Sequence, residues 1–150
     1  GLKGEVPDGD IAIPFGKADV KRAGTDVTIV ALAWAVHEAL AAAEDLAAEG
    51  ISAEVIDPRS LAPLDTETIR ASVQKTGRLV VADEAPPTAS AAAEIATLVV
   101  EDAATFRALK GPVARVCALD APIPYSPALE DHVFPDRKRI AAAARALVKG

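Results

Sequence analysis

Apolar residues recur along the chain in two alternating patterns, which are short β-branched runs and longer stretches with helical spacing. Residues 25–33 (TDVTIVALA) form a β-branched run that is typical of a strand buried on both faces. The segment that follows carries apolar residues at intervals of three and four, which predicts one buried helix face: Val36, Ala39, Leu40, Ala43 and Leu46. Gly50 is placed to end that helix.

The same alternation continues to the C-terminus. Later elements are predicted in turn, with strands over 51–56, 78–82 and 113–118 and helices over 66–75, 91–101 and 137–149. Asp65 and Asp136 are placed as N-caps of two of these helices, and Gly77 is placed to end one of them. A short strand is predicted near residues 18–21, and a single helical turn near residues 127–131.

Strands that alternate with helices through short connections predict βαβ crossovers. Such units build a mainly parallel sheet with helices on both faces, which is a three-layer α/β/α fold. A chain of 150 residues needs only one such domain. We interpret residues 1–10 as a linker end and residues 11–150 as the domain.

Composition and charge exclude several classes of protein. Apolar residues make up 51% of the chain and its mean hydropathy is +0.22, which excludes a disordered chain. The net charge of −6 disfavours binding to nucleic acid. No apolar stretch approaches the roughly 20 residues that a membrane helix needs, and the polar first residues do not form a signal peptide. We therefore expect neither a nucleic-acid partner nor a membrane.

Three residue types are absent or nearly so. Cys117 is the single cysteine, so it forms no internal disulfide and indicates a reducing compartment. Its place in the predicted strand 113–118 indicates a buried, inert thiol. There is no methionine, which predicts a processed product or a part of a longer chain, and there is no asparagine.

The ends of the predicted strands carry candidate residues but no nucleotide-binding glycines. Asp83 and Glu84 follow one strand and are candidates for a general acid or base, or for an anchor at a subunit contact. The favoured alternative is a solvated strand end whose carboxylates accept backbone N–H groups. His37 lies on the polar side of its predicted helix, and is expected to be solvated rather than catalytic.

Other candidates give no complete active site. His132 follows two acidic residues, an arrangement more typical of surface charge than of a catalytic dyad, and Ser90 and Ser126 lack the setting of a nucleophile elbow. The last helix carries basic residues that form either a docking face for an acidic partner or, as we favour, a solvated face: Arg137, Lys138, Arg139, Arg145 and Lys149.

Several motifs together resemble one known family. They are Phe15-Gly16-Lys17-Ala18, Gly24 to Val30, Glu54 to Asp57 with Arg59-Ser60-Leu61, Pro63-Leu64-Asp65, Lys75 to Arg78, and Pro122 to Pro127. Over residues 5–148 the chain closely resembles the C-terminal domain of the β subunit of thiamine-diphosphate-dependent 2-oxo acid dehydrogenases. This family includes the pyruvate, branched-chain 2-oxo acid and acetoin enzymes.

The resemblance implies a transketolase C-terminal-like fold with a mostly parallel sheet of about five strands and one antiparallel edge strand, supplied by the segment near residues 18–21. It implies an assembly and partner-docking domain of an enzyme that oxidatively decarboxylates a 2-oxo acid and passes the acyl group to a lipoyl group. The isolated chain is expected to be non-catalytic. The compartment is expected to be the cytoplasm, or the mitochondrial matrix in a eukaryote.

In this family thiamine diphosphate and Mg²⁺ are held by the α subunit and by the N-terminal domain of the β subunit. Their diphosphate motif, G-D-G followed by paired asparagines, is absent from a chain without asparagine. We therefore assign no catalytic, cofactor-binding or metal-binding residue to this chain. Two departures from the family pattern are a loop without glycine over residues 86–93 and a large side chain at Trp34, and both predict altered local conformation.

The partners that the resemblance implies are the α subunit, a second β subunit and the subunit-binding domain of a lipoyl acyltransferase. Residues 121–135 are the candidate contact region for that basic domain. Stiff prolines, aromatic anchors and acidic charges favour this interface: Pro124, Tyr125, Glu130, Asp131 and Phe134. The alternative for Tyr125 and Phe134 is that both fill the core of the domain itself.

Two other functions stay open. One is a free-standing α/β module that binds a ligand or regulates another protein. The other is the equivalent domain of a different thiamine enzyme, such as transketolase or deoxyxylulose-phosphate synthase. The runs at residues 57–61 (DPRSL) and 124–126 (PYS) fit the dehydrogenase β subunit better.

Overall fold

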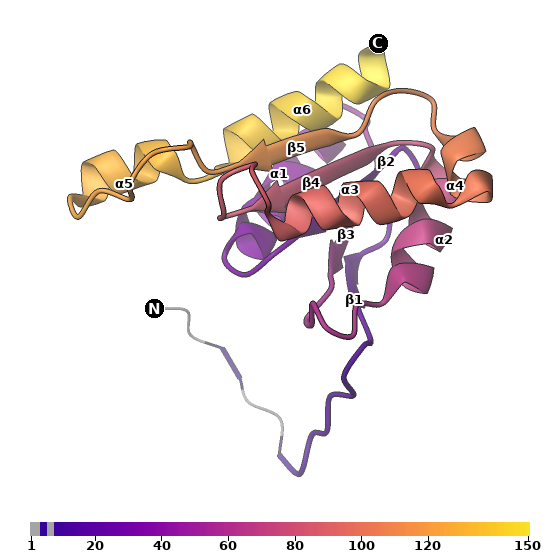
Figure 1. Ribbon diagram of the computed structural model, residues 1–150, viewed down its shortest axis with the longest axis horizontal. Helices are drawn as coiled ribbons and strands as arrows, with labels where there is room; N and C mark the ends of the chain where they lie inside the picture. The colour runs from indigo at the N-terminus through magenta and orange to yellow at the C-terminus, as the bar shows by residue number, and fades with distance from the viewer. Residues whose placement is uncertain (1–3, 6–7) are drawn as a thin grey trace.

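The computed structural model describes residues 4–5 and 8–150, and its centre is a five-stranded sheet (Figure 1). The strands are β1 (Asp19–Arg22), β2 (Val27–Ala31), β3 (Ala53–Asp57), β4 (Leu79–Asp83) and β5 (Ala114–Cys117). They lie in the order β1-β3-β2-β4-β5, and β1 pairs antiparallel with β3 whereas the other neighbours are parallel. The predicted fold class, with its one antiparallel edge strand, is confirmed.

Helices cover both faces of this sheet. They are α1 (Ala35–Ala48), α2 (Thr66–Thr76), α3 (Ala91–Glu101), α4 (Ala103–Ala108), α5 (Pro127–Val133) and α6 (Arg137–Lys149). α1 and α6 pack together against one face, α2 and α3 lie against the other, and α4 packs on α2 and α3 (Figure 1). α5 stands away from both layers.

Strand β2 is buried along its whole length because both of its faces are covered. Val27, Ile29 and Ala31 pack into the apolar cluster beneath α1 and α6. Val30 packs into the cluster beneath α2 and α3. The β-branched run in the sequence follows from this double burial, since a strand between two helical layers has no polar face.

The predicted elements are confirmed, with ends that differ by no more than two residues, but the sequence did not predict α4. Asp102 is the single residue between α3 and α4, and its backbone leaves the helical conformation at φ −81° and ψ 114°. The Asp102 carboxylate accepts the backbone N–H of Thr105 at 2.8 Å and so begins the new helix. The apolar pattern runs on across this break and therefore conceals it.

The predicted helix caps are confirmed. Asp65 accepts the backbone N–H of Thr68 at 3.2 Å, and Asp136 accepts that of Arg139 at 2.7 Å. The second oxygen of Asp65 accepts the backbone N–H of Ala18 at 3.0 Å. One carboxylate thus begins α2 and also holds the chain that enters β1.

The predicted linker end over residues 1–10 lies partly on residues 1–3 and 6–7, outside the described residues. Residues 4–5 and 8–18 form no helix or strand, and this segment extends away from the domain (Figure 1). The division at residue 10 stays a prediction. Across the described chain, no helix combines the length and the apolar content that a membrane crossing requires.

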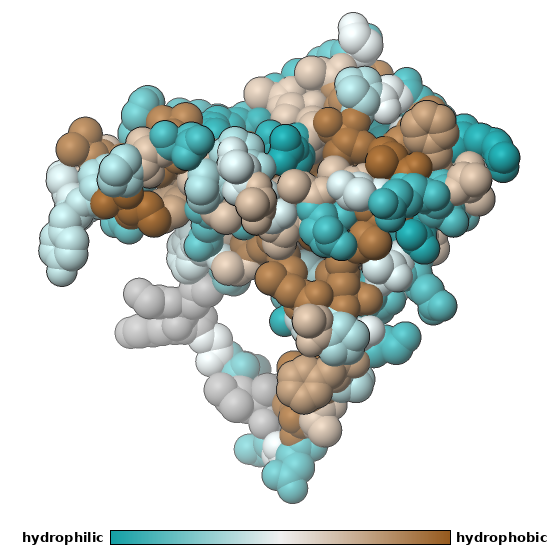
Figure 2. Space-filling model, viewed as in Figure 1, coloured by the Kyte–Doolittle hydropathy of each residue, from teal (hydrophilic) through white to brown (hydrophobic). Residues whose placement is uncertain are grey.

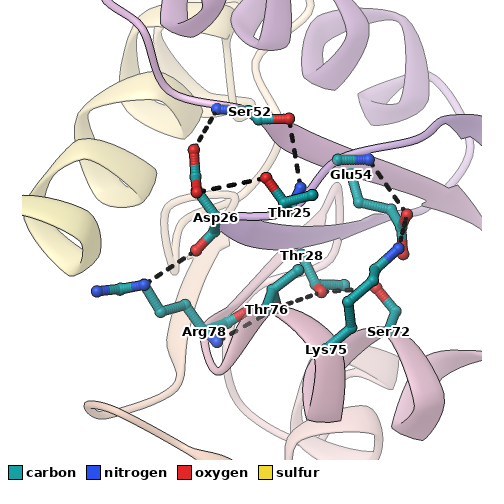
Figure 3. A network of polar contacts seen from close by, with 10 residues as sticks. Thr25, Asp26, Thr28, Ser52, Glu54, Ser72, Lys75, Thr76 and Arg78 are labelled. Atoms are coloured by element: carbon teal, nitrogen blue, oxygen red, sulfur yellow. Dashed lines mark hydrogen bonds and ion pairs between the residues drawn. The ribbon is translucent and has the colours of Figure 1, made fainter.

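A buried carboxylate joins the start of β2 to β3 and α2. Glu54 is 3% exposed, accepts the backbone N–H of Gly24 at 3.2 Å and forms an ion pair with Lys75 (Figure 3). Burial opposes its ionisation most strongly, but the hydrogen bonds from Lys75 and Gly24 outweigh burial. The pKa of Glu54 therefore lies below its usual 4.5.

A second polar group is buried beside it. The hydroxyl of Thr28 lies 2.7 Å from the Ser72 hydroxyl and 2.8 Å from the Thr76 hydroxyl (Figure 3). All three residues are buried, so each hydroxyl needs these partners to replace water. The bonds fix α2 over the centre of the sheet.

The approach of Gly24 to β3 leaves no room for a side chain. A Cβ atom at Gly24 would lie 2.2 Å from the carbonyl carbon of Ala53 and 2.3 Å from the nitrogen of Glu54. Both neighbours are backbone atoms of a buried strand. Only glycine therefore allows this contact.

Replacing Gly24 with alanine should lower the free energy of unfolding by about 1–3 kcal/mol, because the new methyl group would displace buried backbone. Gly111→Ala is the matched control, since nothing lies within 4 Å of a Cβ atom at Gly111. Urea denaturation of both variants measures the difference. Equal urea midpoints for the two variants would show that Gly24 does not pack this closely against β3.

Replacing Glu54 with glutamine should lower stability at neutral pH by about 1–3 kcal/mol, since a charged hydrogen-bonded group is lost from a buried site. Because the pKa of Glu54 is lowered on folding, its contribution is present above the unfolded pKa and is lost as the pH falls through the folded pKa. As the pH falls below about 4.5, the variant should therefore lose less stability than the wild type. Denaturation at a series of pH values measures this slope. The exposed Glu101→Gln is the control, and should keep the wild-type slope.

Cys117 should react with a thiol reagent much more slowly in the native protein than in the unfolded one. It lies at the end of β5 with 5% exposure, and burial, together with the charge of Asp83, raises the pKa of its thiol. The rate of absorbance change with an aromatic disulfide, with and without denaturant, measures the ratio. Similar rates in the two states would mean that this thiol is accessible.

Candidate partner interface

Residues 119–135 form an arm that projects from the sheet beyond β5 and carries α5 (Figure 1). The backbone N–H of Leu119 donates to the carbonyl of Val133 at 3.0 Å and so closes the base of the arm. Pro127 occupies the first turn of α5, where a missing N–H removes no helical hydrogen bond. The arm is therefore a closed loop with a short helix near its tip.

One arginine of α6 fixes this arm to the domain. The guanidinium of Arg139 donates to the carbonyls of Cys117 at 2.6 Å, Phe134 at 3.0 Å and Val133 at 3.4 Å. These carbonyls belong to β5 and to the returning end of the arm. Both ends of the arm are thus held by the same side chain.

The five residues predicted for the interface all lie on this arm. Tyr125 is fully exposed and Asp131 is exposed, whereas Pro124, Glu130 and Phe134 are half-buried. The alternative that Tyr125 fills the core of the domain is wrong, because the arm carries it away from the helical layers. Phe134 lies at the base, where it is partly covered.

Two of these five residues also line a cavity of about 300 Å³ at the base of the arm. Asp131 and Phe134 meet residues there from α1 and from the start of α6, and the full lining is Trp34, Glu38, Asp131, Phe134, Pro135 and Asp136. Pro124, Tyr125 and Glu130 do not line it. Sequence reasoning noted Trp34 only as an unusual residue, because the pattern does not show that α1 and the arm are neighbours.

The histidines form no catalytic pair. His37 is exposed and lies against Trp34, with ring centroids 5.0 Å apart. His132 is exposed in the last turn of α5. Ser126 stands at the N-cap of α5, and Ser90 at the N-cap of α3, where its hydroxyl accepts the N–H of Ala93 at 3.3 Å. The hydrogen bond of Ser90 indicates a structural role for that side chain.

Asp83 accepts backbone N–H groups as predicted, but it is not solvated. It is 6% exposed, and its oxygens accept the N–H groups of Ala85 at 3.0 Å and Ala92 at 3.1 Å. The loop between them has no glycine, and Ala89 adopts the left-handed conformation with φ 54°. Glu84 is half-buried, and its Oε1 has no hydrogen-bond partner within the described residues. Asp83 therefore shapes the loop before α3.

The basic residues of α6 form a face that is largely exposed, as predicted, but most of them are also paired within the domain. Arg137 binds Asp45 through two hydrogen bonds, and Arg145 and Lys149 both pair with Glu49 of the α1 C-cap. The hydrogen bond from Arg145 lowers the pKa of Glu49 to about 2. The sequence did not predict these ion pairs, because it does not show that acidic residues of α1 lie opposite these cations.

A further cavity, of about 560 Å³, lies at the carboxyl ends of β2 and β3. Arg59 and Lys21 reach into its wall, but both pair with Asp19, at 2.6 Å and 2.7 Å. Arg59 also adopts the left-handed conformation, with φ 58°. Among the described residues, no group of three or more histidine, cysteine or acidic side chains could hold a metal ion.

Comparison with known proteins finds long matches. The β subunit of the acetoin:2,6-dichlorophenolindophenol oxidoreductase of Cupriavidus necator is 51% identical over 150 residues, which are all of this chain and 44% of that protein. The pyruvate dehydrogenase E1 component subunit beta of Bacillus subtilis is 44% identical over 145 residues, or 97% of this chain and 44% of that protein. The chain thus spans less than half the length of these relatives.

A solved structure shares the fold. The split gene transketolase in its inactive β4 tetramer matches with a TM-score of 0.83 and 33% identity, over 97% of this chain and 46% of that one. The family described as "Transketolase, C-terminal domain" matches residues 16–140. This range includes every strand of the sheet and most of the helical layers, and the chain therefore belongs to the transketolase C-terminal domain family.

Proposed function

We propose that this chain is the C-terminal domain of the β subunit in the decarboxylating component of a 2-oxo acid dehydrogenase complex. The whole enzyme oxidatively decarboxylates a 2-oxo acid and transfers the acyl group to a lipoyl group. Relatives at 44% and 51% identity, named as β subunits of pyruvate dehydrogenase and of an acetoin oxidoreductase, support this assignment. The enzyme works in the bacterial cytoplasm or in the mitochondrial matrix.

Within that enzyme the domain serves assembly and docking. The observation that carries this role is the arm of residues 119–135, which is fixed at its base and bears exposed apolar side chains. Ile123 is 61% exposed, Leu129 58%, and Tyr125 is fully exposed. Apolar side chains exposed together on a rigid support are typical of a protein interface rather than of a free surface.

The residues of this chain do not fit thiamine diphosphate and Mg²⁺. The described part contains no group of acidic, histidine or cysteine side chains that could hold a metal ion. The sequence has no G-D-G motif followed by asparagine, since asparagine is absent. We expect the cofactor of the whole enzyme to be held by the α subunit and by the rest of the β subunit, and we expect the isolated chain to be non-catalytic.

A second exposed surface supports contact with other subunits of the enzyme. Ile11, Ile13 and Phe15 lie on the segment before β1 and are 62%, 57% and 86% exposed. Figure 2 shows apolar surface on this segment and on the arm that bears α5. The two surfaces are separate, which suits a domain that contacts both the α subunit and a second β subunit.

The arm also fits the basic subunit-binding domain of a lipoyl acyltransferase. Glu130 and Asp131 place two carboxylates in sequence on α5, close to the exposed Tyr125 on the same arm. Negative charge at such a site speeds the approach of a basic partner, and an aromatic side chain anchors it. Because Arg139 already fixes the base of the arm, the arm loses little conformational entropy on binding.

Replacing both Glu130 and Asp131 with lysine in the whole enzyme should slow association with the acyltransferase by at least about tenfold at low salt. The salt dependence of the rate should also become weaker, because the steering charges are reversed. Surface plasmon resonance at several ionic strengths measures both effects.

The control is Glu94→Lys with Glu101→Lys, which makes the same change in net charge on α3. Both glutamates are exposed, and α3 lies away from the arm (Figure 1). This control should associate nearly as fast as the wild type. If the two double variants slow association equally, only the net charge matters and the arm is not the docking site.

A further inference from the structure

The cavity at the base of the arm combines aromatic walls with acidic groups. Trp34, at the N-cap of α1, is 53% exposed, and Phe134 from the end of the arm is half-buried. Carboxylates come from three different elements, namely Glu38 of α1, Asp131 of α5 and Asp136 at the N-cap of α6. None of the residues that line the cavity is basic.

The arginines next to this cavity are already bound elsewhere. The guanidinium of Arg137 binds Asp45, and that of Arg139 binds carbonyls of β5 and of the arm. Their backbone N–H groups donate to two carboxylates of the lining, Glu38 Oε2 at 2.9 Å and Asp136 Oδ1 at 2.7 Å, and the Arg139 guanidinium touches the lining at the backbone carbonyl of Phe134. The cavity thus has acidic groups without an internal counter-ion among its lining residues.

Several carboxylate oxygens remain available. Within the described part of the chain, Glu38 Oε1, Asp136 Oδ2 and both oxygens of Asp131 accept no hydrogen bond from a protein group. Each is free to accept a hydrogen bond from a donor that enters the cavity. The donors that such a set recognises are ammonium or guanidinium groups, which bind carboxylates through charge-assisted hydrogen bonds.

We propose that this cavity binds one lysine or arginine side chain of a partner polypeptide. The aliphatic stem lies along Trp34 and Phe134, and the cationic group lies among Glu38, Asp131 and Asp136. An indole ring attracts a cation over its face, which adds to the pull of the carboxylates. The inference rests on the proposed function for the partner's identity, since Asp131 belongs to both the cavity and the docking arm.

The geometry favours an organic cation over a metal ion. The three carboxylates come from separate elements, and within the described residues they do not form a group that could hold a metal. A volume of about 300 Å³ and aromatic walls suit an extended side chain with an apolar stem. Glu38 belongs to α1 and not to the arm. A substitution at Glu38 therefore tests the cavity separately from docking on the arm.

Trp34 is the single tryptophan of the chain, so its fluorescence reports directly on the cavity. The 150-residue chain is titrated with N-acetyl-L-arginine amide and, separately, with the neutral isostere N-acetyl-L-citrulline amide. We expect saturable quenching by the arginine compound that weakens with added salt, and no saturable change with the citrulline compound. Equal responses to the two compounds would overturn the proposal, because charge would then play no part.

The variant Glu38→Gln with Asp131→Asn should raise the dissociation constant of the arginine compound about tenfold, because two charged acceptors become neutral. Glu94→Gln with Glu101→Gln is the matched control on α3, and should keep the wild-type constant. Circular dichroism shows that each variant is folded. An unchanged constant in the first variant overturns the proposal.

The two proposals fail in different ways. If the acyltransferase docks on the arm but the arginine compound does not bind near Trp34, the cavity proposal is wrong and the proposed function stands. If the arginine compound binds but reversal of charge at Glu130 and Asp131 leaves docking of the acyltransferase unchanged, the arm is not the docking site and the cation site stands. If the acyltransferase docks on the arm of the whole enzyme, Glu38→Gln alone should weaken its binding. An unchanged affinity for the acyltransferase would exclude the cavity from that interface.

Discussion

The burial of β2 on both faces is the constraint on which the rest of the structure depends. A strand without a polar face forces every polar group beside it to find an internal partner, and Thr28 finds Ser72 and Thr76 on α2. Just before β2, the chain passes so close to β3 that only glycine fits at position 24. With both faces covered, surfaces for other molecules are left at the strand ends and on the arm.

Charge is distributed in a way that follows from the same packing. α1 and α6 share one face of the sheet, and their facing surfaces pair Arg137 with Asp45 and Arg145 with Glu49. These pairs use cations of α6 within the domain. The cavity at the base of the arm, in contrast, is lined by three carboxylates and by no basic residue.

The sequence predicted the layers and strands well because each follows from local periodicity. The paired faces of β2 and the caps at Asp65 and Asp136 are local signals of this kind. The cavity was not predictable, because Trp34 and Asp131 are distant in the sequence and meet only through the packing of α1 against the base of the arm. The roles of Arg139 and Arg145 were missed for the same reason, since a helix pattern shows which residues share a face but not what lies opposite.

The clamp by Arg139 has a consequence for how this surface can change. Its guanidinium binds only backbone carbonyls, and these are present whatever side chains the arm carries. Substitutions at the tip therefore leave the attachment of the arm intact. A substitution at a position such as Tyr125 should therefore change what the arm contacts without changing how the arm is attached to the domain.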